Sequence, residues 1–205
     1  MKEFIIEKNE FLTYGNVKGY YHQYYTGFRN EGNPDFINVL KNTFNYESFK
    51  KLKDAKEKVI NILKLDIPNI IKENRLSNCM CICVPRAKAL NTYSNNQLLF
   101  KDAIRIASHS LVNVTDGTNC IRRTKNTKTT HLKNVTFEND GDMPYVGITK
   151  NTCHIDTNAI KDKNIILIDD IYTKSVNVDE DCIQALFDNG AKNVIFYSIG
   201  YTRRL

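Results

Sequence analysis

The sequence lacks the segments by which a chain crosses a membrane or is exported. Its 205 residues contain no apolar run of about 18 residues and no charged-then-apolar leader. We therefore expect neither a membrane span nor a secretory signal. Hydrophobic residues make up 41% of the chain and charged residues 25%, which is ordinary for a soluble globular protein. These totals predict a cytoplasmic protein with no membrane partner and a core large enough for one full α/β domain.

No two cysteines have the Cys-x-x-Cys spacing, although the chain contains six of them. Cys79, Cys81 and Cys83 alternate along the sequence. In a strand, alternate residues share one face, which is poor geometry for a single tetrahedral metal site. We expect all six to be free thiols in a reduced cytoplasm.

Positive charge is in excess, with a formal net charge of +6. Such a balance suits an anionic substrate and equally suits nucleic acid, and charge alone does not separate the two. A run of lysines between residues 50 and 58 lies in a predicted helix. A solvated helix face is the favoured interpretation of that run, with nucleic-acid contact as the alternative.

One stretch, residues 164–178, organises the rest of the chain. Four apolar residues at 165–168 run directly into Asp169 and Asp170. A continuous apolar run is typical of a buried parallel strand, so the two acids are expected at its carboxyl end, where open α/β sheets bind their ligands. Adjacent carboxylates suit the vicinal hydroxyls of a sugar or a hard cation such as Mg²⁺. The alternative is a strand end with two solvated acids before an ordinary turn.

The loop that follows these acids has the composition of a phosphate cradle. Thr173, Lys174, Ser175, Val176 and Asn177 lie between the predicted strand and a predicted helix. Backbone N–H groups at a helix start, together with hydroxyls and an amine, bind phosphate well. The acids and the loop together predict a ligand that carries a ribose and a terminal phosphate.

At these residues the chain resembles the type I phosphoribosyltransferases, whose signature is an apolar strand, two acids, two apolar residues and a Thr-Thr-Gly-x-Thr-like loop. The resemblance implies that Asp169 and Asp170 hold the ribose hydroxyls of phosphoribosyl pyrophosphate (PRPP), directly or through Mg²⁺, and that residues 173–177 hold its 5-phosphate. Lys174 stands where Thr is usual, Ser175 where Gly is usual, and Asn177 where Thr or Ser is usual. A Ser in place of Gly predicts a strained φ or less room for the phosphate, which the charge of Lys174 would offset.

A second apolar strand is predicted at residues 79–84 and ends in Pro85-Arg86-Ala87-Lys88. In type I phosphoribosyltransferases the first core strand ends in a loop that binds pyrophosphate, so the resemblance places pyrophosphate at Arg86, Ala87 and Lys88. Cations there would stabilise the charge of the leaving group. An Arg and a Lys are common in any loop at a strand end. The assignment of pyrophosphate binding to this segment is strengthened by its place before the acid-pair strand in the sequence.

A polar, basic segment at residues 120–135 has no strong period and is expected to be a mobile loop. Arg122, Arg123 and Lys125 would then close over an anionic substrate and exclude water. The segment is similar to a stretch of ComF-like proteins (competence protein F), a branch of the type I family, through Arg123, Thr124, Leu132 and Asn134. The zinc ribbon common in that branch is absent, because no cysteine precedes Cys79. A plain surface loop, with or without affinity for nucleic acid, is the alternative.

The domain prediction follows from these segments. We expect an α/β fold of the type I phosphoribosyltransferase kind, a central mostly parallel sheet flanked by helices, in residues 77–205, with an N-terminal extension or hood in residues 1–76. Pro68 is expected to start a second short helix reaching about residue 75. An edge strand or hairpin is expected at residues 147–158. Helices are predicted at residues 36–40, 46–74, 95–111 and 178–189, and a further parallel strand at 193–199.

Two functions therefore remain open. The first is a phosphoribosyltransferase, with Mg²⁺ as cofactor and a homodimer as the expected assembly, that binds PRPP or a nucleoside 5′-monophosphate and transfers the phosphoribosyl group to an unidentified nitrogen acceptor. The second is a catalytically inactive module of a competence or defence system that senses a nucleotide or binds DNA. The altered phosphate loop and the basic balance motivate the second.

Overall fold

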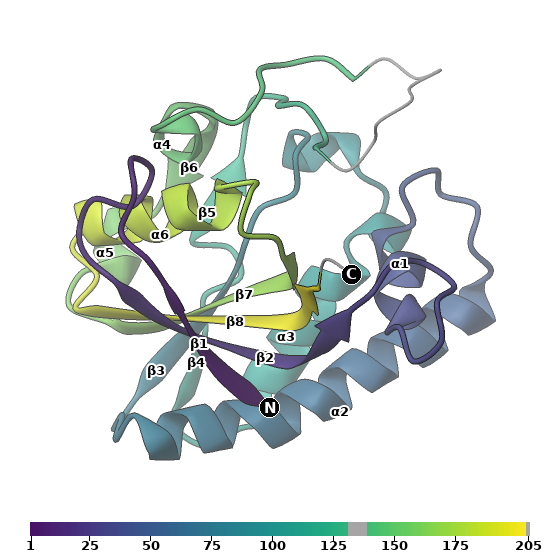
Figure 1. Ribbon diagram of the computed structural model, residues 1–205, viewed down its shortest axis with the longest axis horizontal. Coiled ribbons are helices and arrows are strands. Elements are labelled where there is room, and N and C mark those ends of the chain that lie inside the picture. Colours follow the sequence, from purple (N-terminus) through teal and green to yellow (C-terminus); the bar gives the residue numbers. More distant parts are fainter. Residues whose placement is uncertain (131–138, 204–205) are drawn as a thin grey trace.

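The structure is a computed structural model and describes residues 1–130 and 139–203. Its centre is a six-stranded sheet with the strand order β1-β2-β8-β7-β3-β4 (Figure 1). Only the edge strand β1 is antiparallel to its neighbour, so the sheet is mostly parallel, as the sequence predicted. The strands are β1 (Lys2–Ile6), β2 (Val17–Tyr25), β3 (Cys79–Cys83), β4 (Val114–Asp116), β7 (Asn164–Tyr172) and β8 (Asn193–Thr202).

Helices cover both faces of this sheet (Figure 1). The core on one face lies beneath α1 (Asp35–Lys41), α2 (Phe49–Glu73) and α3 (Leu99–His109). The core on the other face lies beneath α5 (Thr157–Ile160) and α6 (Val178–Asp188). The α/β architecture with flanking helices is therefore confirmed.

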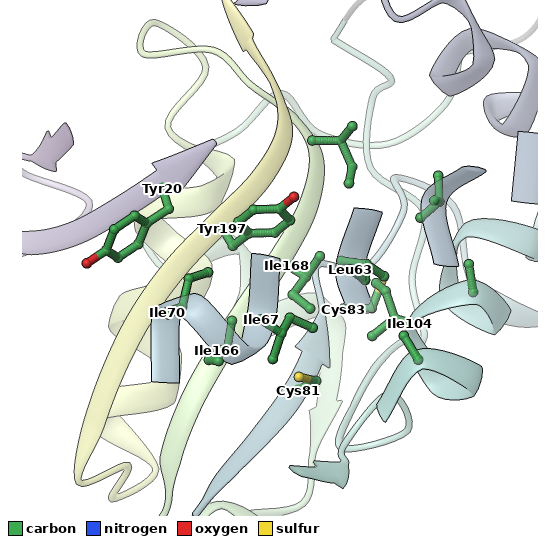
Figure 2. Packing of buried hydrophobic residues seen from close by; sticks show 14 of the residues in the cluster. Tyr20, Leu63, Ile67, Ile70, Cys81, Cys83, Ile104, Ile166, Ile168 and Tyr197 are labelled. Atoms are coloured by element: carbon green, nitrogen blue, oxygen red, sulfur yellow. The ribbon is translucent and has the colours of Figure 1, made fainter. Parts of the chain in front are cut away.

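The alternation of side chains along β3 and β7 explains how the two cores form. Cys81 of β3 and Ile166 of β7 pack against Ile67 of α2, as Figure 2 shows. Their neighbours in sequence, Ile82 and Leu167, belong to the core on the α6 side. Because successive residues of a strand point to opposite faces, a continuous apolar run is what a strand buried on both faces requires.

Helix α2 corrects one prediction, because it passes through Pro68 without ending. A proline inside a helix removes one backbone hydrogen bond. Leu63, Ile67 and Ile70, on either side of the proline, are fully buried against the sheet (Figure 2). Burial of that stripe offsets the lost bond, so a new helix does not begin at Pro68.

The first 76 residues are built into the same sheet and core. Strand β2 lies between β1 and β8 and pairs with β8 in parallel, with Gly19 opposite Phe196. Tyr20 of β2 and the buried face of α2 belong to one hydrophobic cluster with β3, β7 and β8. The N-terminal segment thus contributes two strands to the central sheet and a helix to its core.

A second, two-stranded sheet pairs β5 (Ile121–Arg123) with β6 (Cys153–Ile155). Arg122 and Arg123, which were expected in a mobile loop, are therefore strand residues, and residues 131–135 of that predicted loop lie outside the described residues. The region 147–158, expected as an edge strand or hairpin, contains α4 (Ile148–Thr152), β6 and the start of α5. The predicted helix at 95–111 begins later, because two 3₁₀ turns, η1 (Leu90–Thr92) and η2 (Asn95–Gln97), precede α3.

All six cysteines are free thiols, and the three of β3 line one face as expected. Among the helices that the structure describes, none is long and apolar enough to cross a membrane.

Candidate functional site

A cavity of about 800 Å³ opens at the carboxyl edge of the parallel strands. Open α/β sheets bind their ligands at this edge. The cavity is lined by the last residues of β2, β3, β7 and β8 and by the segments that follow β3 and β7. Of the residues predicted for the site, those on the cavity wall are Arg86, Ala87, Lys88, Arg122, Arg123, Asp169, Asp170, Thr173, Ser175 and Val176, whereas Lys125, Lys174 and Asn177 are not.

The acid pair lies on the cavity wall, but β7 continues past it to Tyr172. The strand is longer than predicted because β8 pairs with it as far as Tyr172 opposite Tyr201. Asp170 forms an ion pair with Lys41, the last residue of α1. Lys41 Nζ lies 3.3 Å from Asp170 Oδ1. Burial, and then the charge of Asp170, raise the pKa of Asp169 to about 7. The pair thus combines one carboxyl that gives up its proton reluctantly with one that has a lysine partner.

A third carboxyl, Asp179, completes the acidic part of the wall. It lies in the first turn of α6, is only 6% exposed, and lines the cavity. Its side chain lies beside that of Asp169, and its Oδ1 atom has no hydrogen-bond partner. Burial, with Asp169 as the next cause, raises the pKa of Asp179 well above its usual value. The sequence suggested only a helix-dipole role for this residue, and only the fold brings it to Asp169.

The loop at residues 173–177 precedes α6, which begins at Val178, so it is not absorbed into the helix. Its turn is closed by the Val176 amide, which donates to the Thr173 carbonyl at 3.0 Å. The left-handed residue of the loop is Asn177, with φ of 58°, rather than Ser175. The Ser in place of the usual Gly therefore introduces no strained φ. Thr173 Oγ1 lies 2.7 Å from Thr202 Oγ1, and both residues line the cavity.

Two residues of this loop face away from the cavity. Lys174 Nζ pairs with Glu7 Oε2 at 2.9 Å, and the lysine side chain is 71% exposed. Asn177 Oδ1 accepts from Asn9 Nδ2 at 3.3 Å. The charge of Lys174 is thus directed toward the N-terminal segment and does not compensate for a lost glycine inside the cavity.

Behind the loop, a buried hydrogen bond joins its two ends. Tyr172 Oη, at the end of β7, donates to Glu180 Oε1 of α6 at 2.7 Å. Burial is the main cause that raises the pKa of Glu180. The bond fixes the distance between the strand end and the helix start, and therefore fixes the path of residues 173–177.

In the segment after β3, the charged groups of Arg86 and Lys88 are bound to other parts of the protein. The Arg86 guanidinium donates to the backbone carbonyl of Gln97 and, at 2.7 Å, to that of Lys41, and it lies 4.4 Å from the Tyr93 ring centroid. Lys88 Nζ pairs with Asp140 Oδ1 at 2.7 Å. Both residues line the cavity, yet their charged groups already have protein partners.

The three cations predicted to close the site lie in different surroundings. Arg123 is 4% exposed, and its guanidinium donates to the Arg86 carbonyl at 2.6 Å and to Thr152 Oγ1. Arg122 is exposed and lies 3.5 Å from His154 Nδ1. Lys125 is exposed and is not part of the cavity wall. Arg123 is therefore a structural residue of the wall, and only Arg122 combines exposure with a place on the wall.

Lys128, in the basic segment predicted at residues 120–135, also lines the cavity, and so do Lys41 and Lys101, which sequence reasoning missed. Lys41 and Lys101 are single lysines outside any motif, so no local signal identified them. With them, seven lysines and arginines line the described wall against three aspartates. The balance of charge suits an anionic ligand whose polar end reaches the acids.

Comparison with known proteins adds no relative, since neither the protein-family models nor the curated proteins contain a match to this chain.

Proposed function

We propose that this protein is a phosphoribosyltransferase of the ComF-like kind. It binds PRPP or a nucleoside 5′-monophosphate in the cavity and transfers the phosphoribosyl group to a nitrogen acceptor with release of pyrophosphate. The proposal places it in the cytoplasm, where its free thiols stay reduced.

One observation carries this proposal: segments that are far apart in the sequence contribute residues to the wall of one cavity. Asp169 and Asp170 lie near the end of β7, Thr173 and Ser175 follow that strand, and residues 85–88 follow the neighbouring strand β3. A ligand with ribose hydroxyls, a 5-phosphate and a pyrophosphate needs three such contacts at one site. The acids suit the hydroxyls, and the loop before α6 suits the terminal phosphate.

The reaction does not require the protein to supply a nucleophile. The bond between the anomeric carbon and the pyrophosphate oxygen breaks, and a bond from that carbon to the acceptor nitrogen forms, through an oxocarbenium-like state. The side chains need only position the ribose, stabilise the leaving charge and exclude water. Asp169 and Asp170 would orient the two hydroxyls while the loop fixes the 5-phosphate.

The carboxylates fit Mg²⁺ only if the substrate phosphates supply further ligands to the ion. Among the described residues no three metal-binding side chains are grouped for one ion. Mg²⁺ is commonly held by one or two carboxylates together with substrate phosphates, and Asp169 and Asp170 offer hard oxygen ligands for that mode. Bound there, Mg²⁺ would neutralise charge on the pyrophosphate.

Calorimetry tests the proposal. PRPP with Mg²⁺ should release heat with the wild type, and the double variant Asp169→Asn with Asp170→Asn should abolish it, because the ribose hydroxyls lose their acceptors. The matched control neutralises two exposed acids on α2, Asp54→Asn with Glu57→Gln, and should bind as the wild type does. No heat from PRPP, ribose 5-phosphate or a nucleoside monophosphate with folded wild-type protein would reject the proposal.

A second candidate is a binding module without turnover. The observation that favours it is that Arg86, Lys88 and Arg123 already have protein partners, which leaves fewer cations for a leaving pyrophosphate. Binding of a nucleoside monophosphate with no pyrophosphate release from PRPP, whatever nitrogen base is added, would support this candidate. DNA affinity that falls steeply with salt and is unchanged in the acid-pair variant would assign the site to nucleic acid instead.

A further inference from the structure

The acidic part of the cavity wall contains three carboxyl groups, of which Asp170 has a lysine as its ion-pair partner. Asp169, Asp170 and Asp179 lie together at the junction of β7 and α6. Asp179 lines the cavity and is more than nine-tenths buried, and its Oδ1 has no hydrogen-bond partner. A buried carboxyl oxygen without a donor is costly, so a cation beside these carboxyls stabilises them.

Lys41 is the cation nearest to that cluster in the described structure. Its Nζ atom is 3.3 Å from Asp170 Oδ1, and both side chains are mostly buried. Its backbone is fixed as well, because its carbonyl accepts from Arg86 Nη2 at 2.7 Å. The residue ends α1 and is followed by Asn42, which caps the helix in the left-handed conformation. Lys41 is therefore held beside the acids from two sides.

The other cations of the wall have different partners. Lys88 pairs with Asp140, and Lys101 Nζ donates to Asn119 Oδ1 at 2.8 Å. Arg86 and Arg123 donate to backbone carbonyls. Among the wall lysines and arginines within residues 1–130 and 139–203, Lys41 alone forms an ion pair with the acid cluster.

We propose that Lys41 is a built-in cation of the acid cluster that competes with a divalent metal ion for Asp170. In the metal-free protein the lysine ammonium neutralises the carboxylate. A metal ion that approaches Asp170 must displace the ammonium or share the carboxylate with it, and like charges so close repel each other. Lys41 thereby weakens metal binding by the protein alone and makes tight binding depend on an anionic ligand that brings phosphate oxygens of its own.

The inference deepens the proposed function and rests on the same cavity, but its test uses a metal alone. Mn²⁺, a probe for Mg²⁺, is titrated into the protein without nucleotide or PRPP, and free Mn²⁺ is measured by electron paramagnetic resonance. Lys41→Met should bind Mn²⁺ more tightly than the wild type by about tenfold, since that factor corresponds to the loss of one charge repulsion of about 1.4 kcal/mol. Lys41→Gln should show the same gain if Met is not tolerated.

Three controls make the result specific. Lys41→Arg keeps the charge and should bind Mn²⁺ as the wild type does. Lys56→Met removes a matched ion pair elsewhere, 3.2 Å from Asp102, and should also leave Mn²⁺ binding unchanged. Adding Asp170→Asn to Lys41→Met should remove the gain.

Unchanged or weaker Mn²⁺ binding in folded Lys41→Met and Lys41→Gln would overturn the inference. If those variants instead lost affinity for a nucleoside monophosphate with metal binding unchanged, Lys41 would be a phosphate ligand, which also contradicts it. Either result leaves the calorimetric test of the proposed function unaffected, because that test measures PRPP binding by the wild type.

Discussion

Two sides of one cavity differ in how completely their charges are partnered. The acid wall, made of Asp169, Asp170 and Asp179, contains a carboxyl oxygen with no donor and two carboxyls whose pKa values are raised. The basic wall, made of Arg86, Lys88 and Arg123, has its charged groups bound to backbone carbonyls, Thr152 and Asp140. The acid wall therefore has unused binding capacity, whereas the basic wall is part of the framework.

This difference separates affinity from stability. Changes in the framework should lower the free energy of unfolding, and changes in the acid wall should alter ligand binding and the response to pH. The four predictions below test that separation, in order of decreasing effect.

The largest effect is expected for Arg123→Met. The variant leaves the Arg86 carbonyl without its 2.6 Å donor and removes the bond to Thr152 in a site that is 4% exposed. Loss of charged hydrogen bonds in a buried position should lower the free energy of unfolding by about 3 kcal/mol. Urea denaturation measures this, with the exposed neighbour Arg122→Met as control. A loss of less than about 1 kcal/mol would show that the basic wall is not structural.

The second effect is on pH dependence and comes from the acid wall. Burial and then Asp170 raise the pKa of Asp169 to about 7, against about 4 in an unfolded chain. The folded state therefore binds a proton that the unfolded state releases. The contribution of Asp169 to stability is fully present below about pH 4 and is lost as the pH rises through about 7.

Urea denaturation at intervals from pH 5 to pH 8 checks this prediction. The wild type should lose stability over that range relative to Asp169→Asn, which does not titrate. Asp54→Asn, on the exposed face of α2, should keep the wild-type slope. Equal slopes for Asp169→Asn and the wild type would contradict the prediction.

A third prediction uses a buried acid that has its partners. Asp66 of α2 accepts from Tyr197 Oη at 2.7 Å and contacts His22 Nδ1 at 2.9 Å. Although burial acts in the opposite direction, the bonds from His22 and Tyr197 lower the pKa of Asp66. Its contribution to stability is present above about pH 4 and is lost as the pH falls, opposite in sign to that of Asp169. Tyr197→Phe should lower the free energy of unfolding by about 1 kcal/mol at pH 7. Denaturation at pH 7 and pH 3 should show a smaller difference at pH 3.

The smallest effect is expected for Lys174→Ala. The lysine lies in the predicted phosphate loop but pairs with exposed Glu7 outside the cavity. Exposed ion pairs contribute little, so the melting temperature and the affinity for a 5′-phosphate should both stay at wild-type values. A clear loss of phosphate affinity would show that the lysine turns inward when ligand binds.

The sequence predicted the parts of the molecule that depend on local pattern. The apolar runs at β3 and β7, the acids that follow the apolar run within β7 and the helix after that strand are all encoded over short stretches. The structure places the acids at the carboxyl edge of the sheet, as expected. The helical periodicity of α2 was equally clear. Its continuation past Pro68 was not, because the packing that offsets a missing hydrogen bond comes from distant strands.

The remainder depends on contacts between distant segments. Lys41 and Asp170 are brought together by the way α1 packs at the edge of the sheet, and Asp179 reaches Asp169 only because α6 folds back on β7. No motif near Lys41 or Asp179 in the sequence indicates that either residue belongs to the site. For the same reason the sequence located Arg86 and Lys88 at the cavity but did not show that their charges were already used.

The place of β2 in the sheet has a consequence for how the chain folds. Gly19 pairs beside Phe196, so β2 leaves the ribosome long before its parallel neighbour β8 has been made. Until then β2 can pair only with β1, and an isolated hairpin is marginally stable. The ligand cavity includes Tyr25 at the end of β2 and Thr202 at the end of β8, so it is completed only after β8 has been made. Until then the unpaired edge of β2 is exposed to other chains.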